Sequence, residues 1–326
     1  MIIAETVCTP SRKKIKTMKI VAVEPIGMTA VQVKDFENKF LKKGHEFVCF
    51  PDRNENPDVL AERMKDAEIV IISNIKLGKD VLEKCPKLKM LSVAFTGLDH
   101  IDLGYCEERG IKVVNAAGYA TEAVAELAIG LMLDVYRKIT ELDSATRKCG
   151  TRNNFLGREI GGKTVGIVGT GAIGLRTALL LKTFGCKIIA WSRTEKEEAK
   201  GIGIEYVALE RLMAEADIIS LHIPLTAATK EVISAEKLAL CKPTAVIINT
   251  ARGGVIDNAA LAQMLRDGRI AGAGIDVFET EPPLANNHPL LSAPNCVLAP
   301  HVGYATREAF DIRIGIVMEN ICKFLE

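Results

Sequence analysis

The chain lacks the features that mark several classes of protein. Its 326 residues include 42 Lys and Arg against 41 Asp and Glu, a formal charge of +1 at pH 7. A protein with this balance has no strong electrostatic attraction for nucleic acid or for an anionic membrane. The most apolar helical stretch, Ala123 to Leu133, contains Glu126 and stops at Asp134, so it is too short and too charged to span a bilayer. We therefore expect neither nucleic acid nor a membrane among its partners.

The cysteines also lack a pattern. Nine of them are dispersed between Cys8 and Cys322 without a Cys-x-x-Cys pair, which indicates reduced thiols rather than a disulfide framework or a zinc ribbon. The basic cluster Arg12–Lys14 follows the first apolar residues, whereas a secretory signal has the reverse order. We predict a cytoplasmic protein with no metal centre, in which residues 1–17 form a frayed extension ahead of the first strand.

What is present is a regular alternation of strand-like and helix-like segments. The apolar, β-branched runs lie near residues 19–23, 46–50, 68–72, 88–93 and 111–114 and, later, near 164–168, 187–191, 205–207, 217–223, 245–250, 271–277 and 296–299. Helical patterns in the first half lie near residues 30–43, 57–66, 78–84 and 102–109. This alternation predicts an α/β fold of doubly wound parallel sheets, and the length favours two domains.

Three further segments carry specific expectations. Thr121 is the expected N-cap of a long helix that ends near Lys138. The polar segment from Glu141 to Gly162 is expected to connect the two units. The last helix, from about Thr306 to Leu325, should pack on the first domain because it has an apolar face. That face includes Ala309, Ile312, Ile316 and Ile321.

A glycine turn follows the strand-like run that begins at Thr164. Gly169, Gly171 and Gly174 give the spacing G-x-G-x-x-G between a strand and a helix. Gly169 permits the tight turn, Gly171 lets the backbone approach a pyrophosphate, and Gly174 lets the helix pack closely on the strand. The start of that helix can then bind phosphates through its open amides. We predict dinucleotide binding; a turn formed for packing alone is the alternative.

The residues at the end of the next strand determine which coenzyme, NAD or NADP, is preferred. NAD-binding sites usually have Asp or Glu there, about 20 residues after the glycines, but this chain has Ser192, Arg193 and Thr194. Two hydroxyls and a guanidinium can donate hydrogen bonds to a 2′-phosphate, which a carboxylate would repel. We therefore predict that NADP(H) is preferred and that NAD(H) remains possible. The alternative is that Arg193 is a solvated surface residue and the coenzyme is NAD.

Three polar side chains stand next to strand ends in the second half: Arg252, Glu281 and His301. Each has an ordinary structural explanation when taken singly. Ligands of open α/β sheets bind at the carboxyl ends of strands, so the three together suit a hydride-transfer enzyme. Arg252 can bind a carboxylate with two hydrogen bonds, and His301 can donate a proton to a developing alkoxide. Glu281 would fix the tautomer of His301 and favour its charged form.

From Met18 onward the chain resembles the D-isomer-specific 2-hydroxyacid dehydrogenases. The segments that carry the resemblance are the glycine turn and residues 94–99, 121–126, 221–226, 249–253, 274–279, 281–282 and 300–303. The resemblance implies the catalytic roles just given to Arg252, Glu281 and His301. It also implies that the backbone amides of Thr96 and Gly97 hold the substrate carboxylate.

The same resemblance implies a coenzyme site, with Asp276 near the nicotinamide. Its expected residues are Thr121, Gly169, Gly171, Ala172, Ile173, Gly174, Ser192, Arg193, Thr194, His222, Pro224, Thr229, Thr250, Ala251, Asp276 and Gly303. The implied architecture is a Rossmann domain, residues 119–301, inserted into a discontinuous flavodoxin-like substrate domain, residues 18–118 and 302–326. A homodimer built through the long helix is also implied.

The departures from the family pattern narrow the expected substrate. Trp191–Thr194 is similar to the NADPH-preferring glyoxylate and hydroxypyruvate reductases, so one of these small 2-keto acids is our first expectation. Pyruvate, as in a D-lactate-type enzyme, or a bulkier 2-keto acid reduced with NADH is the second. Related proteins also act as dinucleotide-sensing corepressors, and that interaction role is the alternative from another class.

Overall fold

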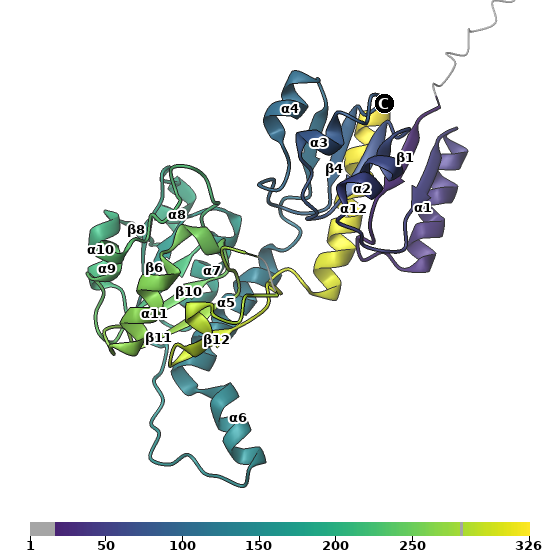
Figure 1. The fold of residues 1–326 in the computed structure, drawn as a ribbon. Coiled ribbons are helices and arrows are strands. Elements are labelled where there is room, and N and C mark those ends of the chain that lie inside the picture. The colour runs from purple at the N-terminus through teal and green to yellow at the C-terminus, as the bar shows by residue number, and fades with distance from the viewer. Residues whose placement is uncertain (1–16, 281–282) are drawn as a thin grey trace, which may run out of the picture. The chain divides into compact units, whose positions relative to one another are not determined.

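The computed structural model describes residues 17–280 and 283–326, and the chain divides into two compact α/β units (Figure 1). The first unit combines residues up to Ala117 with Phe310–Glu326, and the second comprises Gly118–Ala309. The breaks therefore follow residues 117 and 309, where the sequence suggested breaks after residues 118 and 301. The expected extension, residues 1–17, lies outside the described residues except for Thr17.

The first unit is built on a parallel sheet. Its strands are β1 (Lys19–Ala22), β2 (Glu46–Cys49), β3 (Ile69–Ile72), β4 (Met90–Val93) and β5 (Lys112–Asn115). They lie in the order β2-β1-β3-β4-β5, and each neighbouring pair is parallel. Every residue of β3 and β4 is buried, as expected for central strands covered on both faces. This is the flavodoxin-like strand order.

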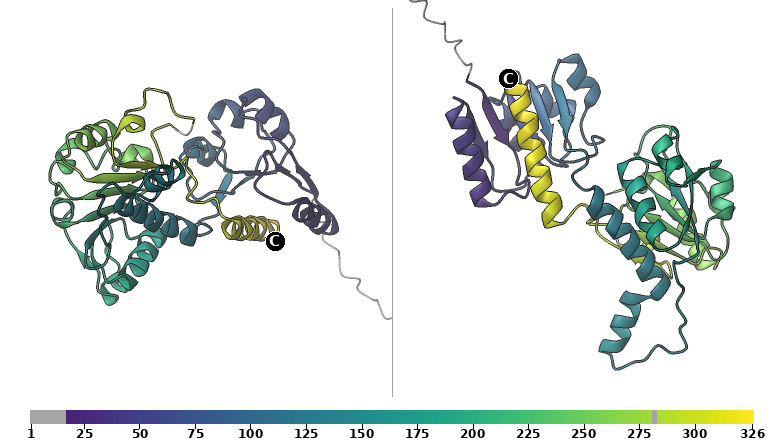
Figure 2. Two further views of the ribbon diagram at one scale, coloured as in Figure 1. Left: turned by 90° about the horizontal axis from the view of Figure 1, so that it is seen from below. Right: turned by 180° about the vertical axis from the view of Figure 1, so that it is seen from behind.

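Helices of the first unit complete its core. They are α1 (Ala30–Lys42), α2 (Pro57–Met64), α3 (Lys79–Leu82), α4 (Leu103–Glu108) and, from the far end of the chain, α12 (Arg307–Leu325). Phe36 and Phe40 of α1 share one buried cluster with Ile314 and Val317 of α12. The two helices therefore cover the same face of the sheet (Figure 2). The prediction that the last helix packs on the first domain is confirmed by this cluster.

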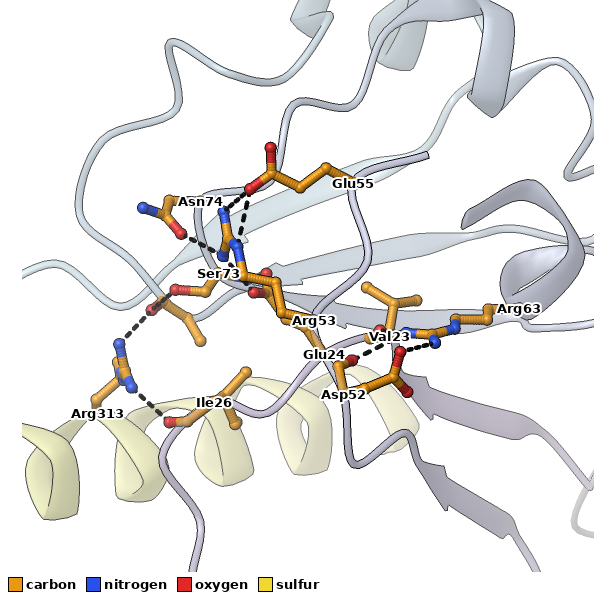
Figure 3. Close-up of polar contacts among 11 residues, drawn as sticks. Val23, Glu24, Ile26, Asp52, Arg53, Glu55, Arg63, Ser73, Asn74 and Arg313 are labelled. Carbon is orange, nitrogen blue, oxygen red and sulfur yellow. Dashed lines mark hydrogen bonds and ion pairs between the residues drawn. The ribbon is translucent and has the colours of Figure 1, made fainter. Parts of the chain in front are cut away.

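A buried arginine anchors α12 at the carboxyl ends of the strands. Arg313 is only 3% exposed, and its guanidinium donates to the carbonyl oxygens of Ile26 (Figure 3) and Ala94. The guanidinium also lies 4.2 Å from the centre of the Phe310 ring. Ile312, predicted to face the core, is instead 50% exposed. That prediction was wrong because a charged residue occupies the buried face, which a pattern of apolar residues cannot reveal.

A buried carboxylate lies near the same strand ends. Glu24, which follows β1, is 1% exposed and accepts from the amide of Ser73, 2.8 Å away. It also pairs with Arg53 at 2.6 Å, and Arg53 donates to Asn74 at 2.8 Å (Figure 3). Burial raises the pKa of Glu24, while the Ser73 amide and the Arg53 guanidinium act in the opposite direction. This network joins the ends of β1 and β3 to the loop after β2.

The second unit is built on a larger parallel sheet. Its strands are β6 (Thr164–Val168), β7 (Lys187–Trp191), β8 (Glu205–Tyr206), β9 (Ile218–Leu221), β10 (Val246–Asn249), β11 (Gly272–Ile275) and β12 (Cys296–Leu298). They lie in the order β12-β11-β10-β9-β6-β7-β8. Read from β8, this is the dinucleotide-binding order 3-2-1-4-5-6 with one strand added. The predicted fold class, two doubly wound parallel-sheet domains with one Rossmann fold, is confirmed.

Helices cover both faces of this sheet (Figure 2). They are α5 (Thr121–Arg137), α7 (Ala172–Thr183), α8 (Glu197–Gly201), α9 (Leu209–Glu215), α10 (Ala235–Leu238) and α11 (Asn258–Arg266). One buried cluster includes α5 and α7, and the other includes α9 and α11. Ala120, not Thr121, is the N-cap of α5, and no side chain caps this end. The predicted Thr121 cap was wrong because the helical conformation begins one residue earlier than the capping pattern suggested.

The segment predicted to connect the two units lies inside the second unit. Lys138, with φ 50°, ends α5 and begins a separate helix, α6 (Ile139–Arg147), none of whose residues is buried. The chain then returns to β6 of the same sheet, and Figure 1 shows α6 leading away from that sheet. The expectation of an inter-unit connector was wrong because polar composition alone cannot separate an exposed helix from a linker.

We predict that Arg313→Met destabilises the protein by about 2–4 kcal/mol. The substitution keeps an apolar stem but leaves the Ile26 and Ala94 carbonyls without a buried cation. Urea denaturation measures the change in the free energy of unfolding. Lys323→Met on the same helix is the control, because Lys323 is exposed. An Arg313→Met effect no larger than that of Lys323→Met would contradict the anchoring role.

Candidate functional site

Six of the residues predicted for the site follow strands at one edge of the second unit's sheet. Because its strands are parallel, their carboxyl ends share that edge. The predicted residues that follow successive strands from β7 to β12 across the sheet are Ser192, Gly169, His222, Thr250, Asp276 and His301. The strand order reverses between β6 and β9, and such a switch point is where open α/β sheets bind ligands.

The three glycines of the turn differ in what surrounds them. Gly169 has φ 101°, and a Cβ there would lie 2.5 Å from the His222 carbonyl oxygen. A Cβ on Gly174 would lie 2.0 Å from the Gly169 carbonyl oxygen. Both glycines are therefore required by the protein's own packing. A Cβ on Gly171 would meet no protein atom within 4 Å, so this position leaves open space beside the backbone, as an approaching pyrophosphate requires.

Helix α7 begins at Ala172, directly after that open position. No side chain caps its first turn, so the amides of residues such as Ala172 and Ile173 are available to an anion. Across the edge, the Thr250 hydroxyl is buried and finds no hydrogen-bond partner among residues 17–280 and 283–326. An unsatisfied buried hydroxyl is costly, and a bound polar ligand would satisfy it. The residues therefore fit a dinucleotide.

The loop after β7 presents hydrogen-bond donors to solvent. Arg193 and Thr194 are exposed and Ser192 is partly exposed. Within the described part of the chain, none of these three side chains makes a hydrogen bond or an ion pair with another residue. The hydroxyls and the guanidinium are thus available to a ligand, and no carboxylate takes their place at the end of β7.

Asn249 shapes the backbone that carries Arg252. The Asn249 side chain is fully buried; its oxygen accepts from the Ala251 amide and its nitrogen donates to the Arg252 carbonyl, both at 3.0 Å. Gly253 is required next, because a Cβ there would lie 1.8 Å from the Phe278 carbonyl carbon. These contacts hold the loop after β10 against the loop after β11, and they fix where the Arg252 side chain begins.

His301 has a left-handed backbone conformation, with φ 56°, which is strained for a residue other than glycine. Asp276, 1% exposed, holds this conformation: its carboxylate accepts from the amides of Val302 at 2.8 Å and Gly303 at 2.9 Å. Gly303 is tightly placed, since a Cβ would lie 3.0 Å from Asp276 Oδ2. The centres of the His301 and Tyr304 rings lie 5.6 Å apart, and the two rings meet edge to face. Sequence reasoning placed Asp276 at the coenzyme and missed this support of the His301 loop.

The loop after β9 contains three more predicted residues. His222 Nε2 lies 2.9 Å from the hydroxyl of Ser220, and burial lowers the pKa of His222 to about 4, so its ring is neutral at pH 7. The Thr229 hydroxyl donates to the Pro224 carbonyl at 2.6 Å and accepts from the Thr226 amide at 2.8 Å. In this structure Thr229 therefore closes its own loop.

Other predicted residues lie elsewhere. Thr96 and Gly97 follow β4 in the first unit, and the Thr96 carbonyl accepts from Asn115 at 2.7 Å. Glu281 lies outside the described residues. Nearby Glu279 pairs with His288 Nε2 at 3.1 Å. Burial alone would raise the pKa of Glu279, but hydrogen bonds from His288 and Asn258 lower it. Sequence reasoning missed this pair.

Two features are absent from residues 17–280 and 283–326. No group of three or more His, Cys, Asp or Glu side chains in that part of the chain is arranged to hold a metal ion. None of the helices formed there combines the length and the apolar character needed to cross a membrane.

Comparisons with known proteins agree with this geometry. The family profile described as "D-isomer specific 2-hydroxyacid dehydrogenase, NAD binding domain" matches residues 129–303. A glyoxylate reductase of Thermococcus litoralis is 42% identical over 90% of this chain and 91% of its own.

Two solved structures are similar over most of the chain. One is an acyclic imino acid reductase in complex with NADPH and D-Arg, with a TM-score of 0.85, 33% identity, and coverage of 94% of this chain and 97% of that one. The other is the NADPH-dependent glyoxylate/hydroxypyruvate reductase of Sinorhizobium meliloti in complex with NADP and malonate. Its TM-score is 0.81 at 31% identity, with 94% and 93% of the chains covered.

We predict that Asp276→Asn loosens the His301 loop. An amide presents only one oxygen, so one of the two backbone N–H donors of Val302 and Gly303 would face an NH₂ group. Amide hydrogen exchange at these two residues should accelerate, and the free energy of unfolding should fall by about 1–3 kcal/mol. Asp267→Asn, at the exposed end of α11, is the control. Unchanged exchange at both amides would show that Asp276 does not hold the loop.

Proposed function

The chain belongs to the D-isomer specific 2-hydroxyacid dehydrogenase family, and from this premise we propose that it reduces a small 2-keto acid to the D-2-hydroxy acid with NADPH as the preferred coenzyme. The enzyme is an NAD(P)-dependent oxidoreductase with an NAD-binding domain. Glyoxylate and hydroxypyruvate are the proposed substrates. The observation that carries the proposal is that Arg252 and His301 lie on the same sheet edge as the glycine turn.

Each proposed catalytic residue has a chemical task. Arg252 binds the substrate carboxylate and polarises the keto oxygen, because its planar guanidinium can donate two parallel hydrogen bonds. His301 donates a proton to the keto oxygen as that oxygen becomes an alkoxide. Glu281 is assigned the task of favouring the protonated form of the imidazole through its negative charge. The amides of Thr96 and Gly97 bind the carboxylate. The bound coenzyme supplies the hydride that reduces the carbonyl carbon.

The preference for NADPH rests on the loop after β7. Ser192, Arg193 and Thr194 offer donors to a 2′-phosphate, and the carboxylate that selects the ribose 2′-hydroxyl in NAD-binding sites is absent from these three positions. The similar reductases solved with NADPH and with NADP support the same choice. The glyoxylate reductase relative and the glyoxylate/hydroxypyruvate reductase support the proposed substrate class.

We predict that His301→Gln lowers kcat for keto acid reduction by about 10²–10⁴, because glutamine cannot deliver a proton. The Kd for the coenzyme should stay nearly unchanged, since the glycine turn remains intact. Stopped-flow turnover and a fluorescence titration of coenzyme measure the two quantities. The matched control is His45→Gln, which makes the same change next to β2 in the first unit. Retained turnover after His301→Gln would refute the role of His301 as the proton donor.

We predict a higher kcat/KM with NADPH than with NADH. Arg193→Gln should reduce kcat/KM for NADPH by about tenfold and leave that for NADH nearly unchanged, since only NADPH carries the 2′-phosphate. Ser192→Asp should reverse the preference, because a carboxylate repels that phosphate and binds the 2′-hydroxyl.

The experiment is a panel of glyoxylate, hydroxypyruvate, pyruvate, and branched and aromatic 2-keto acids, each assayed with both coenzymes. Arg266→Gln, an exposed change at the end of α11, is the control. Equal or better use of NADH by the unmodified enzyme would overturn the coenzyme preference. Best turnover on a branched or aromatic acid would overturn the proposed substrate class and leave the reaction type intact.

A further inference from the structure

One tyrosine hydroxyl joins two loops at the carboxyl edge of the second unit's sheet. Tyr206 belongs to β8, the last strand of the sheet, and pairs with Ala190 of β7. Its hydroxyl donates to the Thr170 hydroxyl at 2.8 Å and accepts from the Lys196 amide at 3.1 Å. Thr170 lies inside the glycine turn after β6, and Lys196 ends the loop that follows β7. Both hydrogen-bonding functions of the phenol are therefore used to connect these loops.

The hydrogen bonds of Tyr206 help to fix the loop that follows β7, residues 192–196. At its start, the Trp191 carbonyl accepts from the Gly169 amide at 2.7 Å. At its end, the Lys196 amide is held by Tyr206. Between these two ties, the side chains of Ser192, Arg193 and Thr194 make no hydrogen bond or ion pair within residues 17–280 and 283–326. The position of residues 192–194 relative to the glycine turn is thus set by these two ties, together with the ion pair between Glu195 and Lys200 at 2.9 Å.

The surroundings make this connection costly to lose. Thr170 is only 1% exposed, so its hydroxyl would lose a partner in a place that water does not readily reach. The body of Tyr206 packs against the buried cluster that includes Ala190, Ala199 and Ile204. Packing therefore orients the ring, and the hydroxyl at its tip makes the connection. Removal of the hydroxyl alone would separate these two contributions.

We propose that Tyr206 is a positioning residue for coenzyme selection, which holds the donors of residues 192–194 at a fixed distance from the glycine turn. The inference rests on the proposed function, in which the glycine turn binds the pyrophosphate and this loop binds the 2′-phosphate. The two phosphate sites of NADPH are joined by a ribose of fixed size, so their protein donors must keep a matching separation. NADH has no 2′-phosphate, so its binding depends less on this separation.

The test is Tyr206→Phe, which keeps the ring and removes both hydrogen bonds. Isothermal titration of the coenzyme-free protein with 2′,5′-ADP and with 5′-AMP measures selectivity for the 2′-phosphate directly, without turnover. We expect this selectivity to fall by about tenfold, the equivalent of one or two hydrogen bonds. Amide hydrogen exchange at Lys196 should also accelerate. Thr170→Val removes the acceptor of the same bond and should give a similar loss that does not add to that of Tyr206→Phe.

Tyr136→Phe is the matched control, because Tyr136 is a buried tyrosine of the same cluster and contacts neither loop in the hydrogen bonds described above. It should leave both readouts unchanged. If the unmodified protein prefers 2′,5′-ADP and the Tyr206→Phe variant keeps that preference, the inference fails and the proposed NADPH preference stands. Equal losses of affinity for 2′,5′-ADP and for 5′-AMP would also overturn the inference alone. An unmodified protein without selectivity for 2′,5′-ADP would overturn the inference together with the proposed NADPH preference.

Discussion

The common direction of the strands in the second unit is the constraint on which the site depends. Residues 169, 222, 250, 276 and 301 are widely separated in the chain, yet each follows a strand that ends at the same edge. Parallel pairing requires every connection to cross back over a face of the sheet, so the chain meets this edge once per strand. The two central clusters of buried apolar residues keep the crossovers in place. Packing on the two faces of the sheet therefore fixes the positions of the residues at this edge.

A second constraint acts on the loops at the strand ends. In each of these loops, a buried polar group with satisfied hydrogen bonds holds a backbone conformation that would otherwise relax. Asp276 holds the left-handed conformation of His301 through two amides, and Asn249 holds the loop of Arg252. In the first unit, Arg313 binds carbonyls at the strand ends. Buried polar groups of this kind are favourable only when their partners are in place, so each substitution affects the partner as well.

Much of the fold could be predicted from the sequence, because apolar β-branched runs and helical periodicity recur throughout both units. The parts that could not be predicted depend on tertiary contacts. Arg313 lies on the buried face of α12 because backbone carbonyls there accept hydrogen bonds from its guanidinium. The pattern of apolar residues therefore wrongly placed Ile312 on that buried face. For the site, residue type and place after a strand were sufficient to nominate His301 and Arg252. The role of Asp276 at the His301 backbone and the bridge made by Tyr206 involve single contacts between distant loops, which leave no periodic signal.

The order of the strands also separates two tasks along the edge. Arg252 and His301 follow β10 and β12 on one side of the switch point, whereas the glycine turn and residues 192–196 follow β6 and β7 on the other. Under the proposed function, proton transfer would belong to the first group and the choice between coenzymes to the second. Groups that share no contacts contribute nearly independently to binding and to catalysis. Under the proposed function, a change in the loop after β7 or in its tie to Tyr206 would therefore alter coenzyme selection while the loops after β10 and β12 keep the proposed catalytic residues, Arg252 and His301, in their own surroundings.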